Sequence, residues 1–208
     1  MEDNTVQIRL LKAAELQFRL ASAVRLATTT KRQPLDLPLV WTHGKHKVEY
    51  DEIALTPEEA DYAACSLHRA AIYLMAAQIR EAVISAVPNA KEHSDQEVQS
   101  VYQISRLIRN AFAHHPLYPT WSIDDDCRDR TVTVGDIIRL DTTSLHNKRL
   151  DWRDYGGPLA LLRLSQFVRY QILGDVHLTN EDGKSTRATL SPSIEYYQQG
   201  NLLLWSLD

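Results

Sequence analysis

The sequence predicts a mainly α-helical protein, an antiparallel bundle of about four long helices with small β additions. Long segments with apolar residues at helical spacing are joined by short polar loops, and the strand-like runs are brief. The longest helical segment is rich in alanine, which allows a neighbouring helix to approach closely and is typical of a central bundle element. A chain of 208 residues can bury one substantial core, so we expect a single domain over residues 1–208.

The predicted elements follow from changes of pattern along the chain. The helical core is expected at about 5–27, 57–87, 94–115 and 157–173, the β additions at about 37–53 and 118–142, and a tail at 175–208. The end of the tail, Leu-Leu-Leu-Trp, is too apolar to remain free in water. We therefore expect the tail to dock on the domain or on a second subunit.

Two of the helices have clear start signals. Thr56, Pro57 and Glu59 combine a capping residue, a proline in the first turn and a glutamate that can complete a capping box. Ser94 with Glu97 predicts a second capping box at the start of the third long helix. Local hydrogen bonds of this kind fix where a helix begins.

The first helix and the hairpin after it are predicted from weaker signals. Asn4 with Gln7 is a plausible helix start, and the threonines at 28–30 are expected to end the helix. The hairpin is built around the turn Thr-His-Gly-Lys. His43 and His46 flank that turn, but two histidines alone favour a solvated turn over a metal site.

Composition limits the classes of function. The net charge of −4 gives no overall basic surface, so contact with a nucleic acid would need a local basic patch. Cys65 and Cys127 are too few for a disulfide framework, and the N-terminus lacks a signal-peptide profile. The longest uncharged apolar run, 70–79, is too short to span a bilayer. We expect a cytoplasmic protein without a membrane partner.

The region after the third helix holds two polar clusters with open interpretations. The run Asp124–Asp126 resembles a metal-binding carboxylate cluster, yet consecutive residues point apart, which favours a solvated loop. Further on, three basic residues stand among two aromatic ones, and either phosphate binding or an ordinary surface loop would explain them. The members of this cluster are Lys148, Arg149, Trp152, Arg153 and Tyr155.

The segment 94–116 has two distinct helical faces and ends at a proline. One face is mostly apolar and is expected to enter the core. At about 100° per residue, the opposite arc carries polar and basic side chains. The residues on this arc are Tyr102, Gln103, Arg106, Arg109, Asn110, Ala113 and His114.

The polar arc carries the residue types that phosphate chemistry requires. The guanidinium of Arg109 stays charged, and its fork geometry suits phosphate. His114 lies in the last turn, where the helix dipole favours the imidazolium, and Asn110 is placed at i, i+4 to orient its ring. His115 falls toward the apolar side or just beyond the helix, so we rank it below His114.

The motif Arg109-Asn110-x-x-x-His114 on a long helix resembles the signature of the HEPN superfamily, an Arg, often a polar residue next to it, and a His four to six positions further on. The motif covers six residues, and the helices from about 1 to 173 are compatible with the family's helical bundle. The strands at 118–140 and the long tail are additions to that minimal bundle, which leaves the subfamily and partner open.

This resemblance implies metal-independent RNA cleavage by attack of the 2′-hydroxyl on the adjacent phosphate, at a composite site of a homodimer. It implies catalytic roles for Arg109, Asn110 and His114, and no cofactor or metal is expected. Arg106, Tyr102 and His115 are the predicted substrate-binding residues. A toxin or phage-defence role, with an antitoxin or other protein partner, fits the same resemblance.

Two alternatives stay open beside the nuclease. A non-catalytic HEPN-like module would bind nucleic acid, nucleotide or a protein partner, and the acidic net charge favours it. A metal hydrolase that uses His43, His46 or the run Asp124–Asp126 is a more distant alternative. Arg109 and His114 also have an ordinary structural explanation, as a salt-bridged arginine and a helix-terminal histidine.

Overall fold

The computed structural model describes residues 4–30, 40–49, 55–113 and 115–175, and it confirms a mainly helical protein. The α-helices are α1 (Thr5–Thr30), α2 (Pro57–Ala86), α3 (Gln96–Ala113) and α4 (Pro158–Phe167), and a π-helix, η5 (Val168–Ile172), continues α4. The short 3₁₀ helices are η2 (Ala90–Glu92), η3 (Asp125–Cys127) and η4 (Trp152–Tyr155). The strands are β1 (Val40–His43), β2 (His46–Glu49), β3 (Thr131–Val134) and β4 (Ile138–Asp141).

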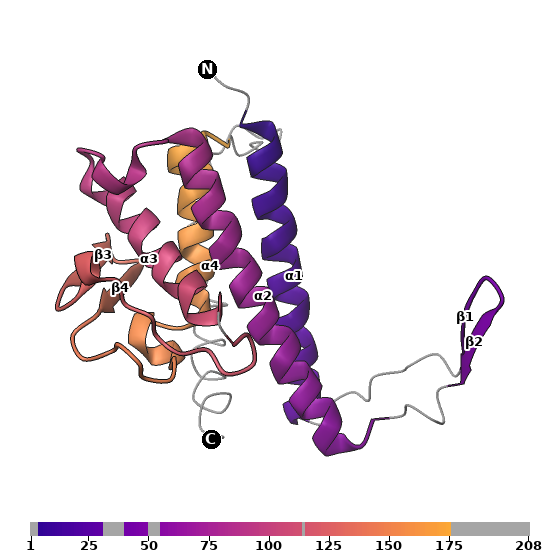
Figure 1. Ribbon diagram of the computed structural model, residues 1–208. Coiled ribbons are helices and arrows are strands. Elements are labelled where there is room, and N and C mark those ends of the chain that lie inside the picture. The colour runs from indigo at the N-terminus through magenta and orange to yellow at the C-terminus, as the bar shows by residue number, and fades with distance from the viewer. Residues whose placement is uncertain (1–3, 31–39, 50–54, 114, 176–208) are drawn as a thin grey trace.

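The α-helices pack side by side, and the sheet formed by β3 and β4 lies against one side of them (Figure 1). The long helices α1 and α2 pack against each other, α3 packs against α2, and α4 lies behind them. The β3–β4 hairpin is antiparallel, with Thr131 opposite Asp141, and it packs on α3. The β1–β2 hairpin is also antiparallel, as predicted, and turns at Gly44, whose φ of +58° suits glycine. The parts of the predicted hairpin at 37–39 and 50–53 lie outside the described residues.

One continuous core joins the helices to the segment after α3. Leu11 of α1, Ile72 and Met75 of α2 and Phe112 of α3 are fully or almost fully buried in it. His68 belongs to the same core, where its ring packs between Phe18 and Trp152 at 5.5 and 6.3 Å. Burial of these side chains is the main stabilising contribution to the fold.

The first helix is longer than predicted, because the three threonines continue it. Their hydroxyls donate to carbonyls of the preceding turn, from Thr28 to Val24, from Thr29 to Arg25 and from Thr30 to Leu26, at 2.7 to 3.2 Å. The prediction that these threonines end the helix at residue 27 was therefore wrong. Each hydroxyl shares a carbonyl four residues back with the helix's own backbone, so the threonines stay within the helix.

The start of α2 is confirmed in detail. The Thr56 hydroxyl accepts from the Glu59 amide, and the Glu59 carboxylate accepts from the Thr56 amide at 2.8 Å. Pro57 occupies the first turn, and Val87 is the C-cap. The predicted span of 57–87 differs from the helix by a single residue.

The start of α3 differs from the prediction by two residues. The carboxylate of Asp95, and not the hydroxyl of Ser94, accepts from the Glu97 amide at 2.8 Å. α3 therefore begins at Gln96, and it ends at Ala113. Aspartate competes well for the capping position because a charged acceptor there interacts favourably with the helix dipole.

The first part of the β addition predicted at about 118–142, around Trp121, is an ordered loop instead. Trp121 is fully buried, its backbone amide donates to Lys148 and its indole donates to Asp154 at 2.6 Å. Thr120 and Arg149 form a single isolated bridge beside it. Hydrogen bonds to distant residues thus replace the regular strand ladder, and of the predicted strand region 118–142 only β3 and β4 are strands.

The last helix fills its predicted span but changes type part-way. Gly156 and Gly157 have φ of +89° and +86°, a conformation that favours glycine, and they lead directly into α4. At Val168 the helix widens into η5, where Arg169 is buried. Arg169 and the Ser165 hydroxyl both donate to Glu15 of α1, at 2.9 and 2.8 Å. This buried ion pair joins α1, the first helix, to η5, the last helical segment of the described chain.

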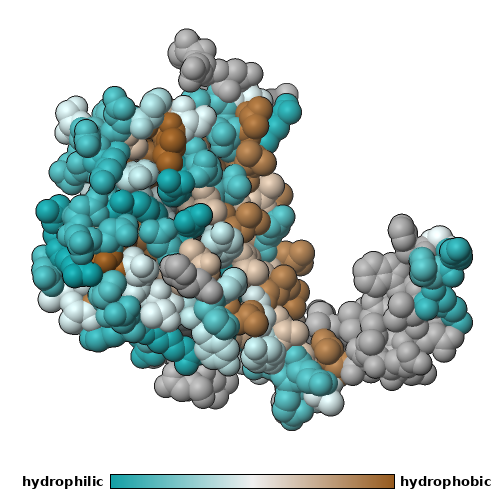
Figure 2. Space-filling view, in the orientation of Figure 1, coloured by the Kyte–Doolittle hydropathy of each residue, from teal (hydrophilic) through white to brown (hydrophobic). Residues whose placement is uncertain are grey.

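Part of the surface over α1 and α2 is apolar. Figure 2 shows hydrophobic residues scattered down the length of these two helices, between hydrophilic ones. Leu16 and Leu20 of α1 are more than 60% exposed, and Leu67 of α2 is about half exposed. Despite this, no helix within the described ranges combines the length and apolarity that crossing a membrane requires. The tail from residue 176 onward, including its predicted docking segment, lies outside the described residues.

Candidate functional site

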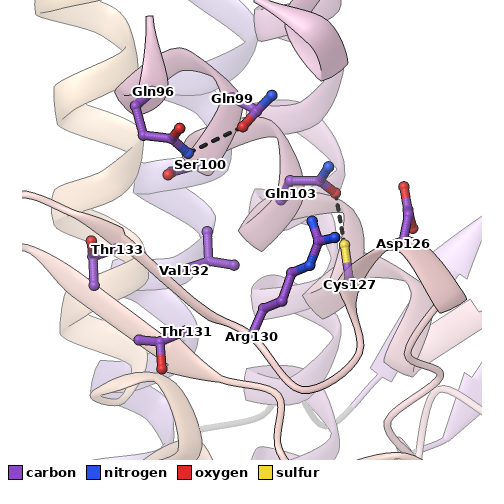
Figure 3. Close-up of a pocket in the computed structure, with 10 residues that line it drawn as sticks. All are labelled: Gln96, Gln99, Ser100, Gln103, Asp126, Cys127, Arg130, Thr131, Val132 and Thr133. Carbon is purple, nitrogen blue, oxygen red and sulfur yellow. Dashed lines mark hydrogen bonds between the residues drawn. The ribbon is translucent and has the colours of Figure 1, made fainter.

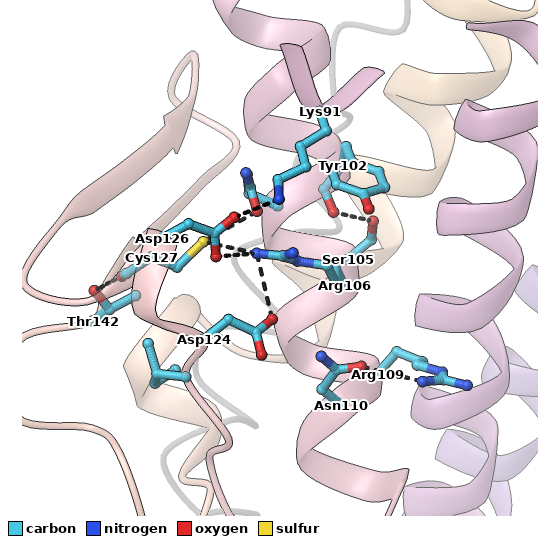
Figure 4. Close-up of polar contacts among 12 residues, drawn as sticks. Lys91, Tyr102, Ser105, Arg106, Arg109, Asn110, Asp124, Asp126, Cys127 and Thr142 are labelled. Atoms are coloured by element: carbon cyan, nitrogen blue, oxygen red, sulfur yellow. Dashed lines mark hydrogen bonds and ion pairs between the residues drawn. The ribbon is translucent and has the colours of Figure 1, made fainter. Parts of the chain in front are cut away.

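The Arg-Asn pair of the motif lies on the last two turns of α3. Both side chains are half-buried, and Arg109 Nη1 donates to the Asn110 side-chain oxygen at 3.2 Å. Figure 4 shows the guanidinium of Arg109 extending toward α2, while Asn110 lies on the side of Asp124. Within the described ranges no carboxylate is in ion-pair contact with Arg109, so its charge is not balanced by a partner there. His114 lies outside the described residues.

Beyond the end of α3, two aromatic rings lie close together on the surface. The exposed His115 packs edge-on against Tyr118, with ring centroids 5.3 Å apart. Tyr118 is itself about half exposed, and the Arg149 guanidinium lies over its ring at 5.7 Å. A stacked arginine, a tyrosine and a histidine thus form one exposed cluster next to the motif.

A second arginine reaches the same region from α2. Arg69 Nη1 donates to the carbonyl of Leu117 at 2.9 Å and fixes the chain that leaves α3. The Nε atom of Arg69 is buried and has no hydrogen-bond partner in the described part of the chain. Arg69, Arg109 and Arg149 therefore place three cations near the end of α3, which is a local basic patch on an acidic protein.

Sequence reasoning missed Arg69 and Tyr118, and it left Arg149 undecided. Arg69 lies 48 residues before its partner Leu117, so no local pattern links them. The basic cluster at 148–153 was a usable signal for Arg149. Its aromatic members are not exposed partners for a phosphate, however, because Tyr155 is fully buried and Trp152 packs against Phe112.

Arg106, predicted to bind substrate, is held within the protein by acidic residues of the following loop (Figure 4). It donates to Asp126 at 2.9 Å and to the Cys127 sulfur at 3.1 Å, and it forms an ion pair with Asp124 at 3.4 Å. Lys91 contacts the second oxygen of Asp126 at 3.0 Å. The charge of Arg106 is therefore balanced internally, and the aspartate run is only partly the solvated loop that the sequence predicted.

The electrostatics of this cluster keep its ions charged. Burial acts to raise the pKa of Asp126, but the hydrogen bonds from Lys91 and Arg106 have the larger effect and lower this pKa to about 2. Burial lowers the pKa of Arg106, and its bonds to Asp126 and Cys127 outweigh that effect and raise it. Burial raises the pKa of the Cys127 thiol, so this cysteine stays protonated and is a poor nucleophile at neutral pH.

Tyr102, another predicted substrate-binding residue, is enclosed by two arginines. The guanidinium groups of Arg80 and Arg106 lie over its ring at 5.9 and 5.7 Å. The ring is half-buried and packs against the core, so only part of it is accessible. Tyr102 thus links α2 to the Arg106 cluster rather than standing free on the surface.

The polar face of α3 therefore carries two neighbouring centres. Arg106 and its carboxylates form a neutralised centre, and the end of the helix forms a basic centre with an uncompensated arginine, an amide and an exposed histidine. The basic centre has the groups that bind a phosphodiester and orient a proton-transferring ring. Across the described ranges, no three His, Cys, Asp or Glu side chains come together in a group that could hold a metal ion.

Comparison with known protein families, curated proteins and solved structures gives no match.

Proposed function

We propose that the protein is a metal-independent endoribonuclease of the HEPN type, acting as a homodimer. The observation that carries the proposal is the basic centre at the end of α3. There Arg109 lacks a carboxylate partner in the described chain, and Arg69 and Arg149 add charge around the Arg-Asn-x-x-x-His motif. Three arginines beside a stacked tyrosine suit a single-stranded RNA, whose backbone needs cations and whose bases stack on aromatic rings.

The proposed chemistry is attack of the 2′-hydroxyl on the adjacent phosphate. The reaction needs a base at the 2′-oxygen and an acid at the leaving 5′-oxygen, on opposite sides of phosphorus, with positive charge between them. Arg109 binds the phosphate, His114 transfers protons and Asn110 orients the imidazole. Because one chain supplies one such motif, a twofold axis that brings two copies together supplies both the acid and the base.

The other predicted residues have supporting roles. His115 and Tyr118 pack together at the surface, and in this proposal they contact a base or ribose next to the scissile phosphate. Arg106 acts as a positioning residue, because its contacts with Asp124 and Asp126 hold the loop after α3 against the helix. Tyr102 supports Arg106 through its ring.

A non-catalytic module that binds RNA or a protein is the second candidate. The specific observation that favours it is the neutralised charge of Arg106, which removes one cation from the polar face of α3. Such a module would use the same basic centre for binding without proton transfer. RNA binding without cleavage, in wild type at several protein concentrations, would identify this module.

Cleavage of a mixed RNA pool in excess EDTA tests the proposal. We expect wild type to cleave and Arg109→Ala to lose at least about a hundredfold in rate, because a donor aimed at the transition-state charge is removed. Arg19→Ala, an exposed arginine on α1, is the matched control and keeps full activity. Cleavage that requires a divalent metal, or equal rates for Arg109→Ala and wild type, contradicts the nuclease.

A further inference from the structure

A polar pocket lies between the first half of α3 and strand β3 (Figure 3). Its volume is about 260 Å³. Gln96, Gln99, Ser100 and Gln103 line it from the helix, and Val132 and Arg130 line it from the hairpin side. Gln103 and Asn110 are seven residues apart, so the pocket and the basic centre are separated by about 10 Å along the helix.

The hydrogen bonds of the pocket leave its amide groups facing the cavity with unused capacity. The Cys127 thiol donates to the Gln103 oxygen at 3.1 Å, and the Gln103 amide nitrogen has no acceptor among the described residues. Gln96 donates to Gln99 at 3.1 Å, which leaves the Gln96 oxygen as an acceptor. The Ser100 side chain, whose residue is 2% exposed, lines the pocket from α3. The spare donor and acceptor are therefore open to a ligand or to water.

Two of the carboxylates at the pocket are paired within the protein. Asp126 lines the pocket, and Asp125 and Asp129 are exposed on the adjoining loop. The Arg130 guanidinium extends toward Gln103 and Cys127 (Figure 3), and no carboxylate of the described chain pairs with it. Because Asp126 is paired with Arg106 and Lys91, and Asp125 with Arg128, Arg130 can donate to acceptor atoms of a ligand.

A nucleobase has these properties. Glutamine amides bind base edges through a paired donor and acceptor, and arginine binds the two acceptors on the outer edge of guanine. Single-stranded RNA exposes such edges, and Val132 offers an apolar wall for the flat face of the ring. Its volume of about 260 Å³ leaves room for a two-ring base.

We propose that this pocket binds an unpaired purine base of the RNA whose phosphate is held at the end of α3. The pocket then determines which sequence is presented to the basic centre. This proposal rests on the proposed function for the identity of the ligand, but the pocket can be tested separately from cleavage.

The test is calorimetric titration of the whole protein with AMP, GMP, CMP, UMP and ribose 5-phosphate. We expect AMP or GMP to bind more tightly than the pyrimidine nucleotides and ribose 5-phosphate. Gln103→Met, which removes both hydrogen-bonding atoms, should weaken purine binding by about tenfold, since a paired contact to a base contributes about 1–3 kcal/mol. Gln17→Met on the exposed side of α1 is the matched control and leaves binding unchanged. Ser100→Val, which fills the pocket, is a second variant if Gln103→Met does not fold.

The outcomes separate the pocket from the nuclease. Purine binding that Gln103→Met or Ser100→Val weakens supports the pocket, even where the protein cleaves no RNA and the proposed function fails. Ribose 5-phosphate that binds as tightly as AMP and GMP overturns the pocket. So does purine affinity that is unchanged in both variants, or RNA cleavage without any binding of purine nucleotides.

Discussion

The side chain of Arg106 illustrates how its neighbours decide the role of a charged residue. Two carboxylates pair with it, and a lysine pairs with one of them, so the charge of Arg106 holds the loop after α3 instead of serving an open binding surface. Its partner Asp126 lies 20 residues further along the chain. A helical wheel places Arg106 on the polar arc but contains no information about that partner. The arc was therefore predictable from sequence, and the internal neutralisation of one of its members was not.

His68 is a residue whose titration should be visible in the stability of the whole protein. Burial lowers the pKa of His68 to about 4, and the nearby charges of Arg25 and Arg69 act in the same direction. The unfolded chain, with the ordinary value of 6.5, binds a proton between these limits while the folded protein does not. The free energy of unfolding should therefore fall as the pH is lowered from 6.5 to 4, by about 3 kcal/mol in total from this group.

Urea denaturation of wild type and His68→Gln between pH 7 and 4 measures this effect. The variant lacks the titrating ring, so its stability should decrease less over this interval, whatever its stability at pH 7. Parallel pH profiles for the two proteins would show that folding leaves the pKa of His68 unchanged, and would contradict this account.

The helices were predictable from sequence where local signals define them. The capping box of Thr56 and Glu59 involves residues three apart, so the start of α2 was correct. α3 was assigned two residues too early because Ser94 and Asp95 are adjacent capping residues, and sequence alone does not rank them. The segment at Trp121 was misassigned because its hydrogen bonds go to Lys148 and Asp154, far along the chain.

The contact between α1 and the end of α4 depends on one buried carboxylate. Glu15 accepts from Ser165 and Arg169, and Arg169 also pairs with Asp175. Glu15→Ala leaves a buried guanidinium with one partner fewer, so we expect a loss of about 3–5 kcal/mol in the free energy of unfolding. Chemical denaturation measures the loss.

The matched control for Glu15→Ala is Glu81→Ala. Glu81 is exposed on α2 and pairs only with its neighbour Arg80 in the described structure. Its replacement should change stability by less than about 0.5 kcal/mol. Equal effects of the two substitutions would mean that the buried pair does not hold α1 against α4.

At the scale of the whole molecule, the proposed function requires two copies of the chain. One chain of 23.7 kDa supplies a single Arg109 and a single His114, whereas the proposed reaction needs an acid and a base. RNA cleavage per chain should therefore fall when the protein is diluted below the dissociation constant of the dimer. Light scattering at the same concentrations should show the mass decreasing from twice the chain mass to the chain mass. Full activity in a solution of monomers would contradict the composite site.

The chemistry of the RNA ends tests the central claim most directly. RNA cleaved by wild type in EDTA should carry 2′,3′-cyclic phosphate ends, since the 2′-hydroxyl is the proposed nucleophile, and the same sequence as DNA should stay intact. His114→Ala should reduce the rate by about 10²–10⁴-fold, the usual contribution of a general acid or base, whereas His93→Ala should retain it. Products with 5′-phosphate ends, cleavage of DNA, or an unchanged rate for His114→Ala would contradict the account.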